Sequence, residues 1–215
     1  VIGVALKDRA SILPAGHHAN GAFWFDDEAG RFITSSFYMD KLPEWVNKFN
    51  KQKLPEKYLS QKWETLYPID SYTQSAADVN NYENEFMEGV KAQFPIDLPA
   101  IYKKKGYGII RSTPFGCNLT FDIAKAAIEG ENLGRNSDTD VLTISCSSTD
   151  YIGHQVGVNA IETEDCYLRL DKALADFFDY LDKTIGKGNY LAFLTADHGA
   201  VNNATFLKDQ KIPAG

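Results

Sequence analysis

The feature that most constrains the fold of this chain is a strand–helix–strand pattern in its last third. Apolar, strand-like runs occupy residues 140–145 and 190–195. Between them, apolar residues recur at the spacing of one face of a long helix, which ends at Gly186 and Gly188. These residues are Leu170, Leu174, Phe177, Leu181 and Ile185. The pattern predicts two parallel strands with a right-handed crossover, and hence an α/β protein with a partly parallel sheet flanked by helices.

Acidic and imidazole side chains follow each of these two strands. Asp150 and His154 come after the first strand, and Asp197 and His198 come directly after the second. The carboxyl ends of parallel neighbouring strands share one edge of a sheet, where ligands bind. Carboxylate oxygen and imidazole nitrogen are ligands that zinc accepts, and paired metal sites are common in phosphoryl transfer. Either motif alone would be explained by a solvated loop, but together they predict a two-metal site with too few ligands to complete it.

A second group of candidate residues follows the apolar run 1–6, which predicts a buried strand of the parallel sheet. Lys7 and Arg9 lie two residues apart at its end, a spacing that places both side chains on one side of an extended chain. Arg offers a planar fork for phosphate oxygens, and Lys a compact charge. The alternative is two surface cations. His17 and His18, in a predicted loop over 13–18, are expected to have hydrogen-bonding or surface roles.

Three stretches of different texture divide the chain. Residues 1–20 are predicted to hold a core strand and the phosphate-binding loop. Residues 21–105, rich in aromatic residues and interrupted by Pro, are predicted to form an irregular cap with helices at 42–49 and about 76–93. Residues 106–215 are predicted to be the α/β core that carries the metal ligands. There, a strand is expected at 106–111, followed by a helix that Asn118 or Thr120 caps and that ends near Gly130.

Composition limits the partners of the chain. A formal net charge of −7 argues against nucleic acid or an anionic membrane as the main partner. No apolar run is long enough to span a bilayer. The three cysteines have neither zinc-knuckle nor redox spacing and are expected to be free, buried thiols: Cys117, Cys146 and Cys166.

Together, these motifs resemble the alkaline phosphatase superfamily. The resemblance rests on the segments 147–154 (SSTDYIGH) and 195–199 (TADHG), preceded by 5–9 (ALKDR) and 13–17 (LPAGH). It covers nearly the whole chain and is strongest to the bacterial phosphate-irrepressible alkaline phosphatases that use a Thr nucleophile. The Asp-His-Gly motif is shared by phosphatases, phosphodiesterases and sulfatases, whereas the Lys-Asp-Arg segment is more specific to this group.

The resemblance implies a role for each residue. Asp150 and His154 would bind the zinc ion that stabilises the leaving-group oxygen, and Asp197 and His198 the zinc ion that activates the nucleophile. Lys7 and Arg9 would hold the phosphoryl oxygens. The implied activity is hydrolysis of a small-molecule phosphate monoester through a covalent phosphoenzyme, with two Zn²⁺ ions, in the periplasm or outside the cell.

The resemblance also implies parts that residues 1–215 do not supply. The family carries its Thr nucleophile and an Asp ligand on an earlier segment, and a third His ligand on a later one. The chain is therefore expected to be an internal piece, inactive by itself, with weak zinc binding and an incomplete sheet whose exposed edge favours self-association. Alternatives are a type I phosphodiesterase or nucleotide pyrophosphatase, a metal-dependent phosphomutase, or a non-catalytic binding module with a degenerate metal site.

Overall fold

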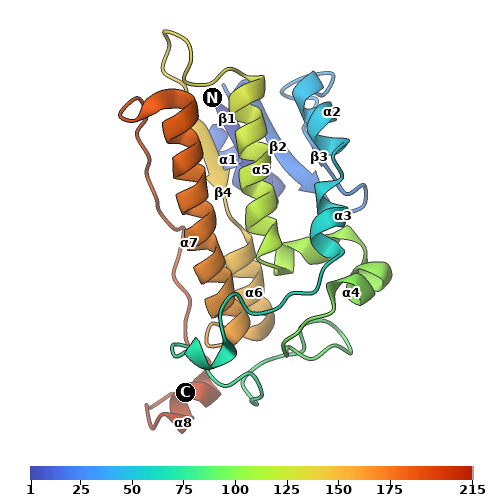
Figure 1. Ribbon diagram of the computed structural model, residues 1–215, viewed down its shortest axis with the longest axis vertical. Coiled ribbons are helices and arrows are strands. Elements are labelled where there is room, and N and C mark those ends of the chain that lie inside the picture. Colours follow the sequence, from blue (N-terminus) through green and yellow to red (C-terminus); the bar gives the residue numbers. More distant parts are fainter. Residues whose placement is uncertain (215) are drawn as a thin grey trace.

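The computed structural model describes residues 1–214 as a four-stranded sheet between layers of helices (Figure 1). The strand order is β3-β2-β1-β4; β1 is parallel to both of its neighbours, and β3 is antiparallel to β2. The strands are β1 (Ile2–Ala5), β2 (Gly21–Asp26), β3 (Arg31–Ile33) and β4 (Leu142–Ser145). The predicted α/β class with a partly parallel sheet is confirmed.

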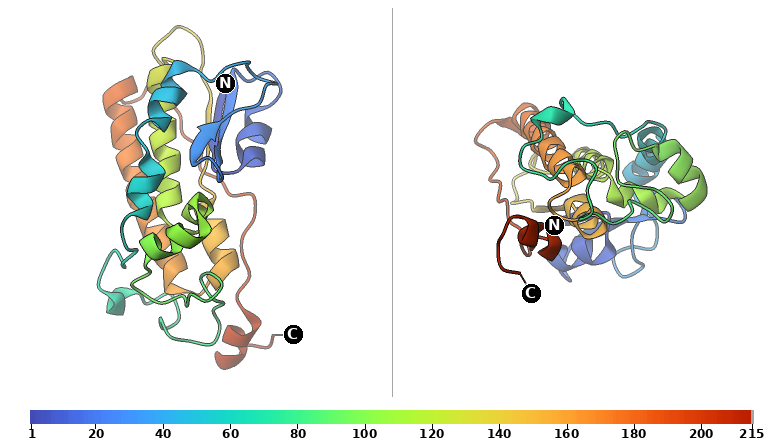
Figure 2. Two further views of the ribbon diagram at one scale, coloured as in Figure 1. Left: turned by 90° about the vertical axis from the view of Figure 1, so that its right-hand side faces the viewer. Right: turned by 90° about the horizontal axis from the view of Figure 1, so that it is seen from below.

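Helices cover both faces of this sheet. Helix α1 (Asp8–Ala15) packs on one face, and α5 (Phe115–Gly130) lies on the other with α7 (Ile161–Leu181) beside it (Figures 1 and 2). The remaining helices are α2 (Glu44–Asn50), α3 (Leu54–Leu59), α4 (Leu98–Lys105), α6 (Ser148–Val156), α8 (Ala204–Asp209), the 3₁₀ helices η1 (Ile69–Ser71) and η2 (Tyr107–Ser112), and the π-helical turn η3 (Asp182–Gly186).

The first strand is buried along its whole length, as its continuous apolar sequence predicts. Gly3 lets α1 approach it closely, because a Cβ at this position would lie 2.2 Å from the carbonyl oxygen of Ser11. Helix α1 continues through Pro14 to Ala15, so the predicted loop over 13–18 begins only at Gly16. The close packing of α1 fixes where the chain leaves β1 at the site edge.

The predicted long helix is confirmed as α7, followed by η3 and a turn at Gly186 with φ 101°. All five predicted apolar positions pack in or against the core. The three cysteines are free: Cys117 and Cys166 are buried, and Cys146 is half-buried.

The second strand of the predicted crossover unit is absent among the described residues. Residues 190–195 are extended but pair with no strand, and β4 is the last strand on that side of the sheet. Residues 191–195 are exposed, and Phe193 is 87% exposed. A continuous apolar run is stable in a sheet only when both faces are covered, and residues 1–214 provide no layer over the outer face of this segment. The predicted parallel pairing with β4 is therefore wrong for this structure.

The stretch 21–105 is only partly irregular. It begins with β2 and β3, which belong to the main sheet, so the expectation of a cap separate from the sheet is wrong for these residues. The helix predicted at 42–49 is confirmed as α2. The helix predicted at about 76–93 is wrong, because Asn80 Oδ1 accepts hydrogen bonds from the backbone N–H groups of Tyr82 and Glu83 and thereby favours a turn.

Two local predictions after residue 105 are also wrong. The segment predicted as a strand at 106–111 forms η2 instead, because Gly106, with φ 75°, ends α4 and turns the chain, and Ile109 and Ile110 are both buried. Helix α5 begins at Phe115 after Pro114, so Asn118 and Thr120 lie inside the helix and do not cap it.

A buried carboxylate fastens the irregular stretch to α7. Asp165 is fully buried, and its Oδ2 accepts hydrogen bonds from Trp63 Nε1 at 2.7 Å and Arg169 Nε at 2.6 Å. Its Oδ1 accepts from the backbone N–H of Leu66 at 2.7 Å and from the Tyr72 hydroxyl. Four donors compensate the desolvation of this charge.

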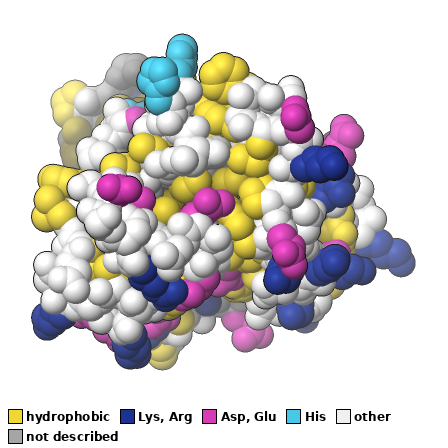
Figure 3. Space-filling model, turned by 90° about the horizontal axis from the view of Figure 1, so that it is seen from above, with side chains coloured by type: hydrophobic (Ala, Val, Ile, Leu, Met, Phe, Trp, Pro, Cys, Tyr) yellow, Lys and Arg dark blue, Asp and Glu magenta, His cyan; other side chains and the backbone are white. Residues whose placement is uncertain are grey.

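The surface shows no strong segregation of charge on the face seen from above (Figure 3). On that face, groups of both signs interleave around an apolar centre. Within residues 1–214, no helix combines the length and apolar character needed to cross a membrane.

A second buried acid on α7 lacks such donors. Glu162 is 0% exposed, and neither of its carboxyl oxygens has a hydrogen-bond partner. Burial, with smaller contributions from Glu83, Asp78 and Asp165, raises its pKa from 4.5 to about 8. The folded state therefore keeps a proton on Glu162 at pH values where the unfolded state has lost it, so stability falls as pH rises from about 4.5 to about 8.

We expect Glu162→Gln to remove much of this pH dependence. Thermal melts should show the variant more stable than the parent at pH 8.5 and nearly equal to it at pH 5. The exposed Glu28→Gln serves as the control and should leave the slope unchanged. A slope of stability against pH that is the same in parent and Glu162→Gln would contradict the assignment.

We expect Gly116→Ala to destabilise the packing of α6 against α5. A Cβ at Gly116 would lie 2.2 Å from Ser148 Oγ and 2.8 Å from the carbonyl oxygen of Ile110. The free energy of unfolding, measured by urea unfolding, should fall by about 1–3 kcal/mol. Gly153→Ala on α6 is the control: its Cβ would meet only Val158, at 3.8 Å, so the higher helix propensity of Ala should stabilise it by about 0.5–1 kcal/mol. Equal effects of the two changes would contradict the packing argument.

Candidate active site

The carboxyl ends of β1 and β4 bring two of the predicted residues together. The two strands are parallel in a register that pairs Ala5 with Ser145, so the chain leaves both at the same edge. Lys7 then precedes the first turn of α1, and Asp150 lies in the first turn of α6. Lys7 Nζ lies 2.8 Å from Asp150 Oδ2, which makes this ion pair the contact between the two halves of the site.

The Asp-x-x-x-His motif lies on a helix and not on the expected loop. Four residues separate Asp150 from His154 on α6, so both side chains lie on one face of the helix. His154 Nε2 is 3.1 Å from Asp150 Oδ1. The spacing that suggested two ligands on one turn of chain is therefore realised by the α-helical period.

Only one of the two candidate ligands in the Asp-His-Gly motif lies near Asp150. The motif lies on the extended segment 190–203, and His198 Nε2 reaches to 3.8 Å from Asp150 Oδ1. The Asp197 side chain is 92% exposed, and its Oδ2 is 3.8 Å from His198 Nε2. His198 thus joins the other groups, whereas the Asp197 carboxylate faces solvent.

Arg9 does not share an extended chain with Lys7. Because β1 ends at Ala5 and α1 begins at Asp8, the strand alternation used to place the two cations together is wrong. Arg9 is exposed in the first turn of α1. His17 and His18 are exposed in the turn after this helix, as expected for surface residues.

Neighbouring groups shift two pKa values at the site. The hydrogen bond from Lys7 holds the pKa of Asp150 below its usual value, despite the opposing effect of burial. The hydrogen bond to the carbonyl of Gly199 and the charge of Asp197 raise the pKa of the His198 imidazole. Both shifts favour the charged form of the group.

The types of donor fit a divalent cation, but their number and placement do not complete a site. One carboxylate oxygen of Asp150 faces two imidazole nitrogens, which is the mixture of ligands that zinc accepts. The other oxygen is engaged by Lys7. Among residues 1–214, no three His, Cys, Asp or Glu side chains stand in an arrangement that holds a metal ion.

Two residues that the sequence motifs did not identify, Tyr151 and Arg111, lie beside Lys7. The Tyr151 ring lies under its ammonium, with Nζ 4.4 Å from the ring centroid. Arg111 Nη1 donates to the Tyr151 hydroxyl at 3.3 Å. Tyr151 follows Asp150 directly and was available as a signal, whereas Arg111 was hidden in a segment predicted to be a strand.

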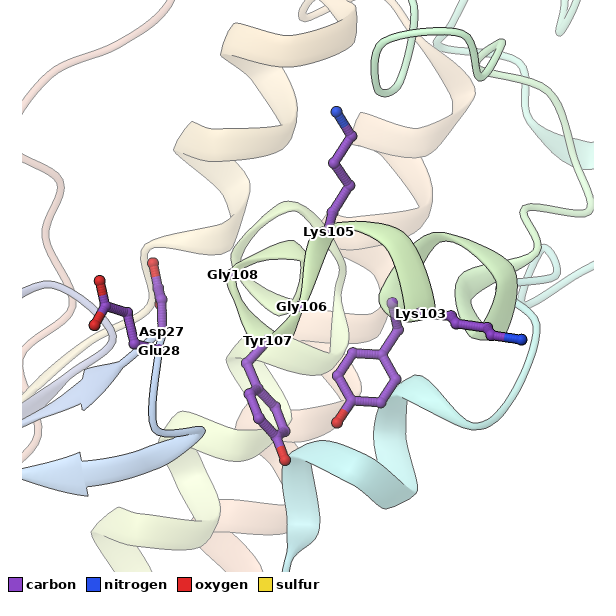
Figure 4. A pocket seen from close by; sticks show the side chains of 8 residues that line it. Asp27, Glu28, Lys103, Lys105, Gly106, Tyr107 and Gly108 are labelled. Atoms are coloured by element: carbon purple, nitrogen blue, oxygen red, sulfur yellow. The ribbon is translucent and has the colours of Figure 1, made fainter.

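An open hollow of about 660 Å³ is lined in part by Asp27, the ion-pair partner of Arg111. Asp27, which forms an ion pair with Arg111 at 2.9 Å, and Glu28 lie on one side of it (Figure 4). Tyr107 and Lys105 lie on the other side, where α4 meets η2. None of the six predicted site residues lines the hollow, so it is not the site itself.

Comparison with known proteins places this geometry in a family. Residues 2–213 match the family described as type I phosphodiesterase / nucleotide pyrophosphatase. A crystal structure of wild-type alkaline phosphatase PafA superposes with a TM-score of 0.96 at 52% identity, covering 99% of this chain and 41% of that chain.

Curated relatives give the same picture. Alkaline phosphatase PhoV of Synechococcus elongatus is 57% identical over all of this chain and 39% of its own length. A Myroides odoratus protein named calcium-transporting ATPase is 56% identical over 40% of its length, and alkaline phosphatase PafA of Elizabethkingia meningoseptica is 54% identical over 39%. The chain spans about two fifths of the length of these relatives. It belongs to the type I phosphodiesterase / nucleotide pyrophosphatase family, within the alkaline phosphatase superfamily.

Proposed function

We propose that the full-length protein containing this chain is a zinc-dependent phosphomonoesterase that acts through a covalent phosphoenzyme. The observation that carries the proposal is the convergence of one cation, one carboxylate and two imidazoles at the carboxyl edge of β1 and β4. Two relatives above 50% identity named alkaline phosphatases support it.

In this proposal, the residues divide the work. Lys7 and Arg9 bind the non-bridging oxygens of the phosphoryl group and stabilise the charge on them. Asp150 and His154 hold one zinc ion, and Asp197 and His198 hold the second. When bound, the two ions stabilise the attacking and leaving oxygens. The assignment is supported by carboxylate oxygens and imidazole nitrogens that lie 3.1 to 3.8 Å apart.

The reaction requires a nucleophile that we place outside residues 1–215. A Thr hydroxyl would attack phosphorus, the alcohol would leave with a proton, and water would then release inorganic phosphate. The substrate is a small-molecule phosphate monoester, and the location is periplasmic or extracellular. Interleaved surface charges and the net charge of −7 favour such a substrate over nucleic acid. The unpaired edge of β4 supports self-association of the isolated chain.

The alternative within the family is a phosphodiesterase, which the family description itself names. A diester presents one fewer charged oxygen, so it depends less on the Lys7 and Arg9 pair. A phosphomutase or a binding module with a degenerate metal site is less well supported, because two of the three relatives described above are named alkaline phosphatases.

We expect the isolated chain with added zinc to show no sustained hydrolysis of p-nitrophenyl phosphate, since it lacks the proposed nucleophile.

In the full-length protein, Asp197→Asn should lower kcat/KM by roughly 100-fold or more through loss of a metal ligand. Asp171→Asn, at an exposed position on α7, is the control and should retain activity. Sustained turnover by the isolated chain that Asp197→Asn abolishes would refute the missing nucleophile.

We expect Arg9→Ala in the full-length protein to separate the two ester classes. Monoester hydrolysis should fall by about 10²–10³-fold and diester hydrolysis by about tenfold or less, because the monoester carries the additional charge. Arg31→Ala, at an exposed position on β3, controls for the change in net charge. Equal losses for p-nitrophenyl phosphate and bis-p-nitrophenyl phosphate would favour the phosphodiesterase.

A further inference from the structure

The Lys7 ammonium has two neighbours of different chemistry. It donates a hydrogen bond to Asp150 Oδ2 at 2.8 Å, and it stands 4.4 Å from the centroid of the Tyr151 ring. The carboxylate attracts the charge toward α6, and the negative face of the ring attracts it from the side. An ammonium carries three N–H groups, so these two neighbours leave donor capacity for a third.

The Tyr151 ring is itself held in place by Arg111. Arg111 Nη1 donates to the Tyr151 hydroxyl at 3.3 Å, and its guanidinium carbon lies 5.8 Å from the ring centroid. Arg111 Nη2 donates to the carbonyl oxygens of Leu6 and Phe25, each at 3.2 Å, and pairs with Asp27. The Arg111 guanidinium therefore links the carboxyl ends of β1 and β2 to Tyr151, the residue that contacts Lys7.

We propose that Tyr151, anchored by Arg111, is a positioning residue that holds the Lys7 ammonium at the edge of β1 for contact with a phosphoryl oxygen. The inference rests on the proposed function for the identity of that oxygen. Asp150 cannot perform this task alone, because it is also assigned to a metal ion, and a bound cation would weaken its pull on Lys7. The ring contact does not compete for the carboxylate, so it persists whether or not Asp150 holds a cation.

The first test is a double-mutant cycle on kcat/KM for p-nitrophenyl phosphate in the full-length protein. Tyr151→Leu should lower kcat/KM by roughly 3- to 30-fold, the range expected for loss of a cation–π contact. Tyr151→Phe keeps the ring and should recover most of that loss. In the Lys7→Ala background, Tyr151→Leu should have little further effect, because the group that it positions is gone.

The matched control is Tyr167→Leu, which removes an exposed tyrosine of α7 that takes part in none of these contacts and should leave kcat/KM unchanged. If Tyr151 served only the stability of α6, its loss would be the same with and without Lys7. Additive losses in the cycle would therefore overturn the proposal.

The second test does not depend on activity. In full-length protein labelled with ¹³C-lysine, the ε-methylene protons of Lys7, assigned with Lys7→Arg, should show an upfield ring-current shift. That shift should persist in Tyr151→Phe and disappear in Tyr151→Leu. Its absence from the parent would overturn the positioning role. An upfield shift in a parent protein that lacks phosphomonoesterase activity would instead overturn only the proposed function and leave the placement of Lys7 by Tyr151 supported.

Discussion

The site depends on the parallel register between β1 and β4. Because Ala5 pairs with Ser145, two segments that are far apart in sequence leave the sheet at the same level. Both then turn immediately into helices, and the first turns of α1 and α6 place Lys7 and Asp150 within 2.8 Å. A shift of this register by one residue would turn the side chains of a strand to the other face and separate the pair.

Two acids on one helix show how the fold treats buried charge. Asp165 has four donors, and three of them, Trp63, Tyr72 and the backbone of Leu66, bind the stretch that contains them to α7. Glu162, one turn earlier, has no partner for its oxygens and keeps a proton instead. The irregular stretch is thus held by satisfied polar contacts to α7 as well as by apolar burial.

The sequence was sufficient for the elements whose pattern is local. The apolar run of β1, the helical spacing of α7 and the Pro-led α2 all appear as predicted. It failed where a distant partner decides the outcome: residues 190–195 have strand-like composition but no covering layer, and η2 takes its form from Gly106 and its packed surroundings. Asp150, His154 and His198, which lie near one another in the structure, were predicted as candidates because motif spacing is local information. Arg111 was not, because its partners lie on β1, β2 and α6 and no spacing records them.

One part of the site lies on packed helices, and the other lies on the mostly exposed segment 190–203, which acts as a tether. Lys7, Asp150 and His154 are built on packed helices, whereas His198 approaches on chain that has no ladder partner. If Asp197 and His198 bind the second cation of the proposed pair, that ion must immobilise the tether, at a cost of about 1–2 kcal/mol of backbone entropy for each residue fixed. The apparent affinity would then understate the strength of the individual coordination bonds. An additional contact that holds residues 190–195 against β4 would strengthen the binding of such a cation without contacting a ligand.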